Sequence, residues 1–442
     1  MIASECNKTM RNVDMDAAAR ASFLKITPRK WRLIRLFEDF LKTMLPLLPS
    51  PRTLNDPESP PQSVLVVEYW NLGDLAILVP FLENLRKALP TARVTLLVNS
   101  GLAKLLDGQG LVDEFIPIRV PWAQHFSRWK KYNLFSGLWT SFARTLLAVR
   151  KRQFDWAFSG RMDVRDNFLL WLSGAARRIG YGFAGGAFLL TDSVLPELSF
   201  PHRTNIWLHL LEGLGHTVDC SLGSLHLTEV EANSANEFLR ERGVPEDALL
   251  IGVHSGARIA TRRWGDDRFA EVTRKLLETT NAHILWFSES PHPEEYPHVE
   301  CCHLVNVEFR RFLALLARCK LLVCNDSGPM HIANLLGVPV VAVFGPQRPE
   351  WFGPRGAQDR VVIRPEFWCR PCFDYCMFDE PYCLRSIPPK SVTDSALEAI
   401  TVIRGTTGGS KKLVEITCGS MSNRQGNIGW SSNDSSEISS SE

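Results

Sequence analysis

Short, mostly apolar runs alternate with amphipathic stretches in two parts of the chain. In the first part, the pattern predicts a strand at residues 64–68, a helix at 75–88 and a strand at 94–98. The second part repeats the alternation, with strands expected at 249–254, 283–287, 321–324 and 340–344. Helices are expected around 269–277, around 309–318 and between the last two strands. Strands that alternate with helices are typical of parallel sheets. The pattern therefore predicts an α/β protein with two doubly wound halves, joined by a crossover within residues 195–248.

Length and local composition predict how the chain is divided. A chain of 442 residues is too long for one ordinary core, so two domains are expected. The expected parts are a peripheral basic segment at 1–60, a first Rossmann-like domain at 61–245, a second at 246–404 and a tail at 405–442. The tail is rich in Gly, Ser and Asn and poor in large apolar residues, which predicts disorder.

Two basic stretches carry large apolar side chains between their cations. Residues 28–48 are expected to form a basic amphipathic helix, and residues 120–152 place tryptophans and phenylalanines among arginines and lysines. Both patterns suit the headgroup region of an anionic membrane. The alternative for each stretch is a helical element that packs on the body of the protein.

The overall charge excludes a dedicated nucleic-acid binder. Fifty Lys and Arg residues balance 48 Asp and Glu residues, so the net charge of +2 provides no global field for a polyanion. No apolar run reaches the roughly 20 residues of a membrane span, and the first thirty residues lack the apolar core of a signal peptide. We therefore expect a soluble, cytoplasmic protein.

The segment 325–346 combines an apolar pattern with polar residues at one helix start. Asp326, Ser327 and Gly328 follow a predicted strand, and His331 comes one turn later. Free N–H groups and the positive end of the helix dipole meet at this point, which suits a phosphate or another anion. The alternative is an ordinary helix cap followed by a core histidine.

Similar polar groups follow two other predicted strands. Asn71, Gly73 and Asp74 come after the strand at 64–68, where Asp74 either caps the helix or presents a carboxylate. A small-residue turn and two nearby cations follow the strand at 249–254: Ser255, Gly256, Arg262 and Arg263. Such a turn suits a diphosphate whose charge arginines neutralise, whereas a surface arginine pair is the alternative. Ligands of open α/β sheets bind beyond the carboxyl ends of the strands, where all these residues are expected.

The eleven cysteines fall into two groups of interest. Cys301, Cys302, Cys319 and Cys324 lie in or beside predicted core elements and are expected to be structural. A C-x2-C-x3-C-x6-C run consists of Cys369, Cys372, Cys376 and Cys383. This run resembles a metal or redox clip but matches no standard zinc or iron–sulfur spacing. We favour reduced packing cysteines over a metal site.

Taken together, these motifs resemble glycosyltransferase family 9, the ADP-heptose:lipopolysaccharide heptosyltransferases and their relatives. The resemblance covers about residues 60–400. It rests on Leu72-Gly73-Asp74, on Gly256-Ala257 with Arg262-Arg263-Trp264, and on Asp326-Ser327-Gly328 with His331, Gly337, Pro339, Gly345 and Pro346. The family usually has a lysine where this chain has Arg262, a change that keeps the charge but alters its geometry.

The resemblance implies a GT-B fold of two facing Rossmann-like domains, with the acceptor on the first and the nucleotide-sugar donor on the second. It implies inverting transfer without a metal or cofactor, from ADP-heptose or another nucleotide diphosphate sugar to a glycolipid at the inner membrane. Asp74 matches the general base, and Asn71 and Gly73 are assigned to the acceptor. The residues assigned to the donor are Ser255, Gly256, Arg262, Arg263, Asp326, Ser327, Gly328 and His331.

Two other functions are compatible with this fold. A nucleotide-sugar epimerase can use the same two-domain architecture, and a protein without turnover can bind a nucleotide sugar as a sensor or scaffold. Asp-x-Asp, a metal-binding motif of other glycosyltransferases, occurs at Asp14 and Asp16, in the peripheral segment, where we interpret it as chance.

Overall fold

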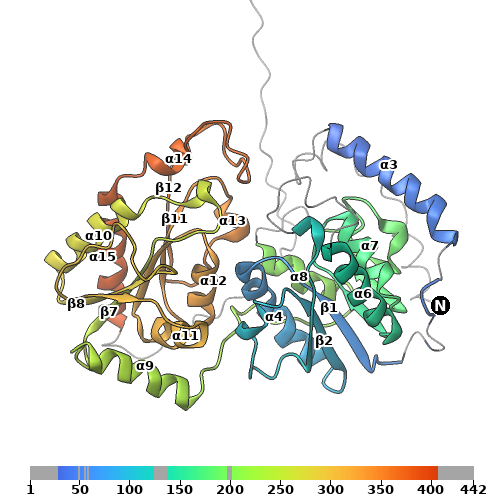
Figure 1. Cartoon of the computed structure of the whole chain (residues 1–442), viewed down its shortest axis with the longest axis horizontal. Helices are drawn as coiled ribbons and strands as arrows, with labels where there is room; N and C mark the ends of the chain where they lie inside the picture. Colours follow the sequence, from blue (N-terminus) through green and yellow to red (C-terminus); the bar gives the residue numbers. More distant parts are fainter. Residues whose placement is uncertain are drawn as a thin grey trace, which may run out of the picture. The chain divides into compact units, whose positions relative to one another are not determined.

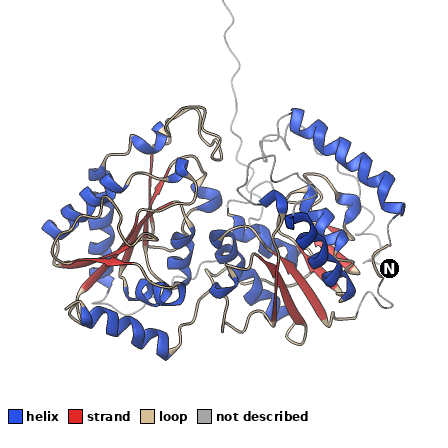
Figure 2. Ribbon diagram, viewed as in Figure 1, coloured by secondary structure: helices blue, strands red, loops and turns tan. Residues whose placement is uncertain are grey.

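The computed structural model describes residues 28–47, 50–53, 56, 59–123, 137–196 and 202–406. Gly405 and Thr406, the first two residues of the expected disordered tail, belong to the last helix, whereas residues 407–442 lie outside the described residues. Residues 124–136 of the aromatic, basic stretch at 120–152 and the Asp-x-Asp motif also lie outside them. Two six-stranded sheets, each entirely parallel, form the centre of the fold (Figures 1 and 2).

The first sheet has the strand order β3-β2-β1-β4-β5-β6. Its strands are β1 Ser63–Val67, β2 Arg93–Val98, β3 Glu114–Pro117, β4 Trp156–Phe158, β5 Arg177–Gly180 and β6 Asp192–Ser193. The helices of this half are α3 Pro28–Met44, η1 Leu45–Leu47, α4 Leu72–Ala88, η2 Ala103–Leu105, η3 Pro121–Ala123, α6 Gly137–Lys151, α7 Val164–Leu172, η4 Ala187–Leu189 and α8 Arg203–Glu212. In β1, all residues after Ser63 are buried, as expected for a central strand covered on both faces.

The second sheet has the order β12-β11-β10-β7-β8-β9. Its strands are β7 Leu249–His254, β8 Ala282–Phe287, β9 Cys302–Val305, β10 Leu321–Asn325, β11 Val340–Phe344 and β12 Arg360–Ile363. The accompanying helices are α9 Glu229–Glu241, η5 Ala260–Arg262, α10 Asp266–Thr279, α11 Phe309–Arg318, α12 Gly328–Leu335, α13 Pro349–Phe352, α14 Tyr382–Arg385 and α15 Pro389–Thr406. Helix α9 packs against α11. The domain boundary at 245/246 and the four-part division remain predictions.

Both sheets reverse their strand order at an equivalent place. In the first sheet, β1 pairs with β4 and the order then runs outward in both directions; in the second, β7 and β10 are the corresponding pair. Val64 is aligned with Val94 on one side and with Trp156 on the other, which fixes the register of this centre. The predicted α/β class with two doubly wound, Rossmann-like halves is confirmed. Ligand sites of such folds lie at this switch point, beyond the carboxyl ends of the strands.

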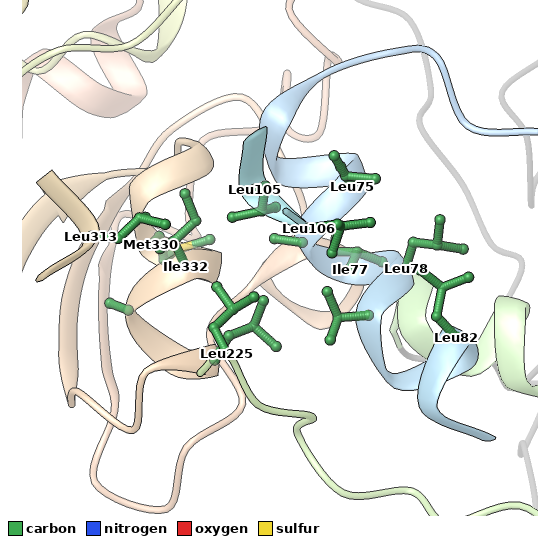
Figure 3. Packing of buried hydrophobic residues seen from close by; sticks show 14 of the residues in the cluster. Leu75, Ile77, Leu78, Leu82, Leu105, Leu106, Leu225, Leu313, Met330 and Ile332 are labelled. Atoms are coloured by element: carbon green, nitrogen blue, oxygen red, sulfur yellow. The ribbon is translucent and has the colours of Figure 1, made fainter. Parts of the chain in front are cut away.

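Helices α4 and α12, one from each half, pack against each other. Leu75 and Ile77 of α4 belong to the same buried cluster as Met330 and Ile332 of α12, as Figure 3 shows. The starts of the two helices approach closely through glycines: a Cβ atom at Gly328 would lie 3.2 Å from Leu72 Cβ and 3.3 Å from the Gly73 nitrogen. The apolar faces of both helices thus bring the ends of β1 and β10 toward one another.

The cysteines expected in the core are mostly buried. Cys302, Cys319 and Cys324 are at most 7% exposed, whereas Cys301 is half-buried. Burial raises the pKa of the Cys324 thiol well above its usual value, with Asp326 adding to the rise. Burial also raises the pKa of the Cys302 and Cys319 thiols, so the three buried thiols remain protonated and act as small apolar side chains. Within the described part of the chain, no helix has the length and apolar character needed to cross a membrane.

Candidate active site

The switch point of the first sheet holds a compact ion cluster. Asp74 lies in the first turn of α4, after β1, and Arg161 follows β4. The Arg161 Nη2 atom is 2.7 Å from Asp74 Oδ1 and 3.5 Å from Glu68 Oε1. The guanidinium also stacks on the Trp70 ring, 4.9 Å from its centroid. One cation therefore serves two carboxylates, and its position fixes that of Asp74.

Burial determines the electrostatics of this cluster. The Glu68 side chain is 2% exposed, and burial raises its pKa, although the charge of Arg161 opposes the rise. For Arg161, burial lowers the pKa, but the carboxylates of Asp74 and Glu68 more than compensate, so its pKa lies above the usual value. The guanidinium stays charged, and the Asp74 carboxylate keeps a permanent counter-ion.

The position of Asp74 decides between the two interpretations of the first motif. Asn71, not Asp74, occupies the N-cap of α4, and its side chain makes no capping hydrogen bond. Asp74 is 17% exposed, and its carboxylate faces Arg161. Asp74 is therefore a partly exposed carboxylate at the strand end rather than a helix cap.

A second buried layer supports the cluster. The Tyr69 hydroxyl donates a hydrogen bond to Asp166 Oδ1 at 2.7 Å and accepts one from Trp122 Nε1 at 3.0 Å. Burial raises the pKa of Asp166 to about 7, with the Asp163 charge adding to the rise. Trp122 also packs with Trp139 and Phe142 of α6. The described part of the stretch 120–152 thus packs on the first half of the protein, while residues 124–136 lie outside the described residues.

The switch point of the second sheet holds Asp326 and Arg262. Arg262 Nη1 lies 3.3 Å from Asp326 Oδ2, and its Nε and Nη2 donate to the two carboxylate oxygens of Asp374 at 2.8 and 2.6 Å. Gln347 Nε2 donates to Asp374 at 2.8 Å. Burial raises the pKa of Asp326 to about 6, although the charge of Arg262 opposes the rise. Arg262 is therefore held by two carboxylates.

The remaining residues predicted for the second half shape its loops. Asn325 Nδ2 donates to the Ser255 carbonyl at 2.6 Å, and Asn325 Oδ1 accepts from the Trp264 N–H at 3.1 Å. Arg263 Nε donates to the Ala257 carbonyl at 2.6 Å, which closes the loop of residues 257–263 directly after Gly256. The Ser327 hydroxyl donates to the Asn325 carbonyl at 3.2 Å. It therefore does not cap α12, although Ser327 occupies the N-cap position.

His331 connects the two switch points. A Cβ atom at Gly73 would lie 3.0 Å from His331 Cδ2 and 3.5 Å from the Gly328 Cα. Burial lowers the pKa of His331 to about 4; the charge of Asp74 opposes this and that of Arg262 adds to it. The imidazole is neutral at pH 7. The structure thus brings Gly73, Asp74, Gly328 and His331 together.

The sequence interpretation missed several site residues. Arg161 follows β4, a three-residue strand too short for a recognisable period, and Asp374 lies 112 positions from Arg262. Arg203 and Arg258 have no hydrogen-bond or ion-pair partner among the described residues. Burial and the nearby Arg161 charge lower the pKa of Arg203 to about 10, and burial lowers that of Arg258. Both remain cationic at pH 7, and the negative charge of Asp74 raises the pKa of each, opposing the effect of burial.

The cysteine-rich run contains free thiols. Cys369, Cys372 and Cys376 are half-buried and Cys383 is buried. Burial raises the pKa of the Cys383 thiol to about 11 and also raises that of Cys372. Across the described ranges, no group of three or more His, Cys, Asp or Glu side chains is arranged to hold a metal ion. That they are reduced packing cysteines rather than a metal site stays a prediction.

Comparison with known proteins identifies related enzymes. The sequence model of the family described as glycosyltransferase family 9 (heptosyltransferase) matches residues 140–382. The chain is 24% identical over 235 residues to lipopolysaccharide heptosyltransferase 2 of Escherichia coli K12, covering 49% of this chain and 66% of that protein, just under two thirds. It is 24% identical over 375 residues to lipopolysaccharide heptosyltransferase 1 of Pseudomonas aeruginosa PAO1, covering 76% of this chain and 97% of the relative.

A solved structure, that of the E. coli heptosyltransferase WaaC with ADP, has a similar fold. The TM-score is 0.59 at 17% sequence identity, and the superposition covers 76% of this chain and 99% of that chain. At this identity, the similarity concerns the fold alone. It agrees with the expected GT-B type architecture of two α/β domains.

Proposed function

Because the chain belongs to glycosyltransferase family 9, we propose that it transfers a sugar from a nucleotide diphosphate donor to a hydroxyl group of a lipopolysaccharide-type glycolipid. Heptose, carried as ADP-heptose, is the proposed sugar, since the relatives are named as heptosyltransferases. The observation that carries the proposal is the Asp74 carboxylate, fixed by Arg161 at one switch point and next to His331 of the other half.

Asp74 is the proposed general base. An acceptor hydroxyl loses its proton as its oxygen attacks the anomeric carbon, and a positioned carboxylate accepts that proton. Arg161 keeps Asp74 in place, while neutral His331 does not compete for the proton at pH 7. Attack from the face opposite the departing diphosphate inverts the configuration at the anomeric carbon.

The second half is proposed to bind the donor. As the bond between the anomeric carbon and the diphosphate oxygen breaks, negative charge accumulates on the leaving group. The start of α12 at Gly328 and the guanidiniums of Arg262 and Arg258 can stabilise this charge without a metal ion. Arg262 is already paired with Asp326 and Asp374, so Arg258 is the cation with spare hydrogen-bonding capacity.

The first half is proposed to bind the acceptor. Arg203 lies at the start of α8, next to the cluster of Asp74, Glu68 and Arg161, and its guanidinium is available for an anionic group of the acceptor. Asn71 and Gly73 stand beside the same carboxylate. Because a glycolipid acceptor is embedded in a membrane, we further propose that the protein works at the cytoplasmic face of the inner membrane.

The direct test incubates the purified chain with ADP-heptose, with and without an acceptor glycolipid. The proposal predicts release of ADP that depends on the acceptor, an acceptor heavier by one heptose, and the same rate in EDTA as in Mg²⁺. An isomerised nucleotide sugar formed without acceptor would identify an epimerase instead. Binding of ADP-heptose without either product would identify a non-catalytic nucleotide-sugar protein.

A further inference from the structure

Helix α3 and the turn η1 carry two separate apolar faces. One face packs on the first half of the protein, where Leu41 is 3% exposed in a cluster with Trp171 and Leu189. Phe37 meets Phe168 edge to face at 6.1 Å. Glu38 Oε1 accepts a hydrogen bond from the Gly186 N–H at 2.6 Å. The helix is therefore fixed in its rotation about its own axis.

The second face points to solvent. Leu33, Leu36 and Phe40 are 66%, 65% and 57% exposed and follow one another at helical spacings of three and four residues. Leu47 of η1 extends this stripe and is 76% exposed. Single exposed apolar residues are common, but four in one stripe on a helix already anchored by its other face indicate an interaction surface.

Cations border the stripe. Arg32, Arg35 and Lys42 are exposed, and the exposed acid of the described part of the helix, Asp39, lies 4.0 Å from Lys42. The other acid, Glu38, is turned inward to Gly186. Lys42 also stacks on the exposed ring of Phe188, at 5.2 Å from the ring centroid. The surface around the stripe is thus positive as well as apolar.

We propose that this stripe is a membrane-docking surface that inserts Leu33, Leu36, Phe40 and Leu47 into an anionic lipid bilayer. Apolar side chains reach the boundary of the acyl chains, while the neighbouring arginines and lysine bind lipid phosphates. The charge argues against a second copy of the chain as the occupant. A two-fold contact through the stripe would bring together two surfaces that carry the same excess of positive charge.

The inference refines the proposed membrane location but does not depend on the reaction. The sequence pattern predicted that the helix at residues 28–48 binds either a membrane or the body of the protein. In this proposal, one face of α3 packs on the protein and the other binds the membrane. Docking through α3 requires no particular sugar or nucleotide, so a vesicle assay tests it separately from transfer.

The test is flotation of the full chain with vesicles of phosphatidylcholine alone or with phosphatidylglycerol added. We expect binding to the anionic vesicles that weakens as salt is raised, and little binding to the neutral ones. The double variant Leu36→Ser with Phe40→Ser should lose at least about tenfold in partitioning. Arg32→Ser with Arg35→Ser should lose about as much and abolish most of the salt dependence.

Val230→Ser is the matched control, because Val230 is 79% exposed on α9, away from the stripe. This variant should float like the parent, and all variants should keep the thermal midpoint and the transfer rate on a water-soluble acceptor. Equal flotation of the parent and the Leu36→Ser, Phe40→Ser variant would overturn the proposal. The proposal would also be overturned if the parent failed to bind anionic vesicles or bound anionic and neutral vesicles equally. A dimer of the parent that the Leu36→Ser, Phe40→Ser variant abolishes would likewise overturn it.

Discussion

Arg161 Nη2 lies 2.7 Å from Asp74 Oδ1, which ties the end of β4 to the start of α4 across the switch point of the first sheet. The same guanidinium is 3.5 Å from Glu68. The proposed base is thus positioned by a residue that makes no contact with the reacting atoms in our account.

Arg161→Gln should lower kcat by roughly 10 to 100-fold while leaving the Kd of the donor nearly unchanged, because a displaced Asp74 meets the acceptor hydroxyl poorly. Arg161→Lys should recover part of the loss, since lysine keeps the positive charge but lacks the planar guanidinium that can contact two carboxylates at once. Steady-state kinetics measures kcat, and calorimetry measures the Kd of the donor.

The matched control is Arg177→Gln, which breaks a comparable ion pair with Asp192 at 2.7 Å and should leave kcat unchanged. Equal losses in both variants would rule out a specific positioning role.

Asp374→Asn should weaken ADP binding by about 5 to 20-fold, because it removes the charged, bidentate hold on Arg262. Titration calorimetry with ADP measures the change. Asp379→Asn is the control in the same loop, since Asp379 is exposed and should leave the affinity unchanged. Unchanged or tighter ADP binding in Asp374→Asn would mean that Asp374 competes with the ligand for Arg262 instead of orienting it.

Gly328→Ala should separate α12 from α4, because the added Cβ would meet Leu72 Cβ at 3.2 Å and the Gly73 nitrogen at 3.3 Å. We expect a loss of about 1 kcal/mol in the free energy of unfolding and at least a tenfold loss in turnover. Gly101→Ala is the control, since nothing lies within 4 Å of its added Cβ. If both variants match the parent in urea unfolding and in turnover, the close approach of the two helix starts is not required for stability or activity.

Asp166→Asn should change how stability depends on pH. The folded-state pKa of Asp166 is raised to about 7 by burial and by Asp163, above the ordinary value of 3.8. Between these values the unfolded chain releases a proton that the folded protein retains, so the parent loses stability as pH rises from about 4 to about 7. The variant lacks this loss. Its free energy of unfolding relative to the parent should therefore rise by up to about 4 kcal/mol over this range and stay constant above it. Parallel urea-unfolding profiles at pH 5 and pH 7.5 would contradict the raised pKa.

The sequence predicted the fold where strands are long and apolar. β1, β2, β7, β8, β10 and β11 have five or six residues in nearly continuous apolar runs, and all six were expected within one or two residues of their observed bounds. β4 and β6 have three and two residues, too few to establish a period, and neither was predicted. Arg161 was missed for the same reason. Ligand-binding residues are sought just after the strands of such a sheet, so a residue that follows an unrecognised strand is not found.

Motif residues were placed correctly where the backbone itself requires them. Gly337, one of the residues that carry the family resemblance, has a φ of 71° directly after the C-cap Leu336, a conformation that favours glycine. Partners that are distant in the sequence could not be inferred in this way. Arg262 meets Asp374 only because the loop after β12 returns to the switch point, and no local pattern encodes that contact. The roles assigned to the site residues remain predictions.

The central claim is that Asp74 accepts the proton of the acceptor hydroxyl. Asp74→Asn keeps the size and much of the hydrogen bonding of the side chain but cannot take up that proton. We predict that its turnover number falls by ~10²–10⁴-fold, with donor affinity nearly unchanged and a thermal midpoint equal to that of the parent. Near-normal turnover in a folded Asp74→Asn protein would contradict the account, because the carboxylate at the switch point would then be only a structural partner of Arg161.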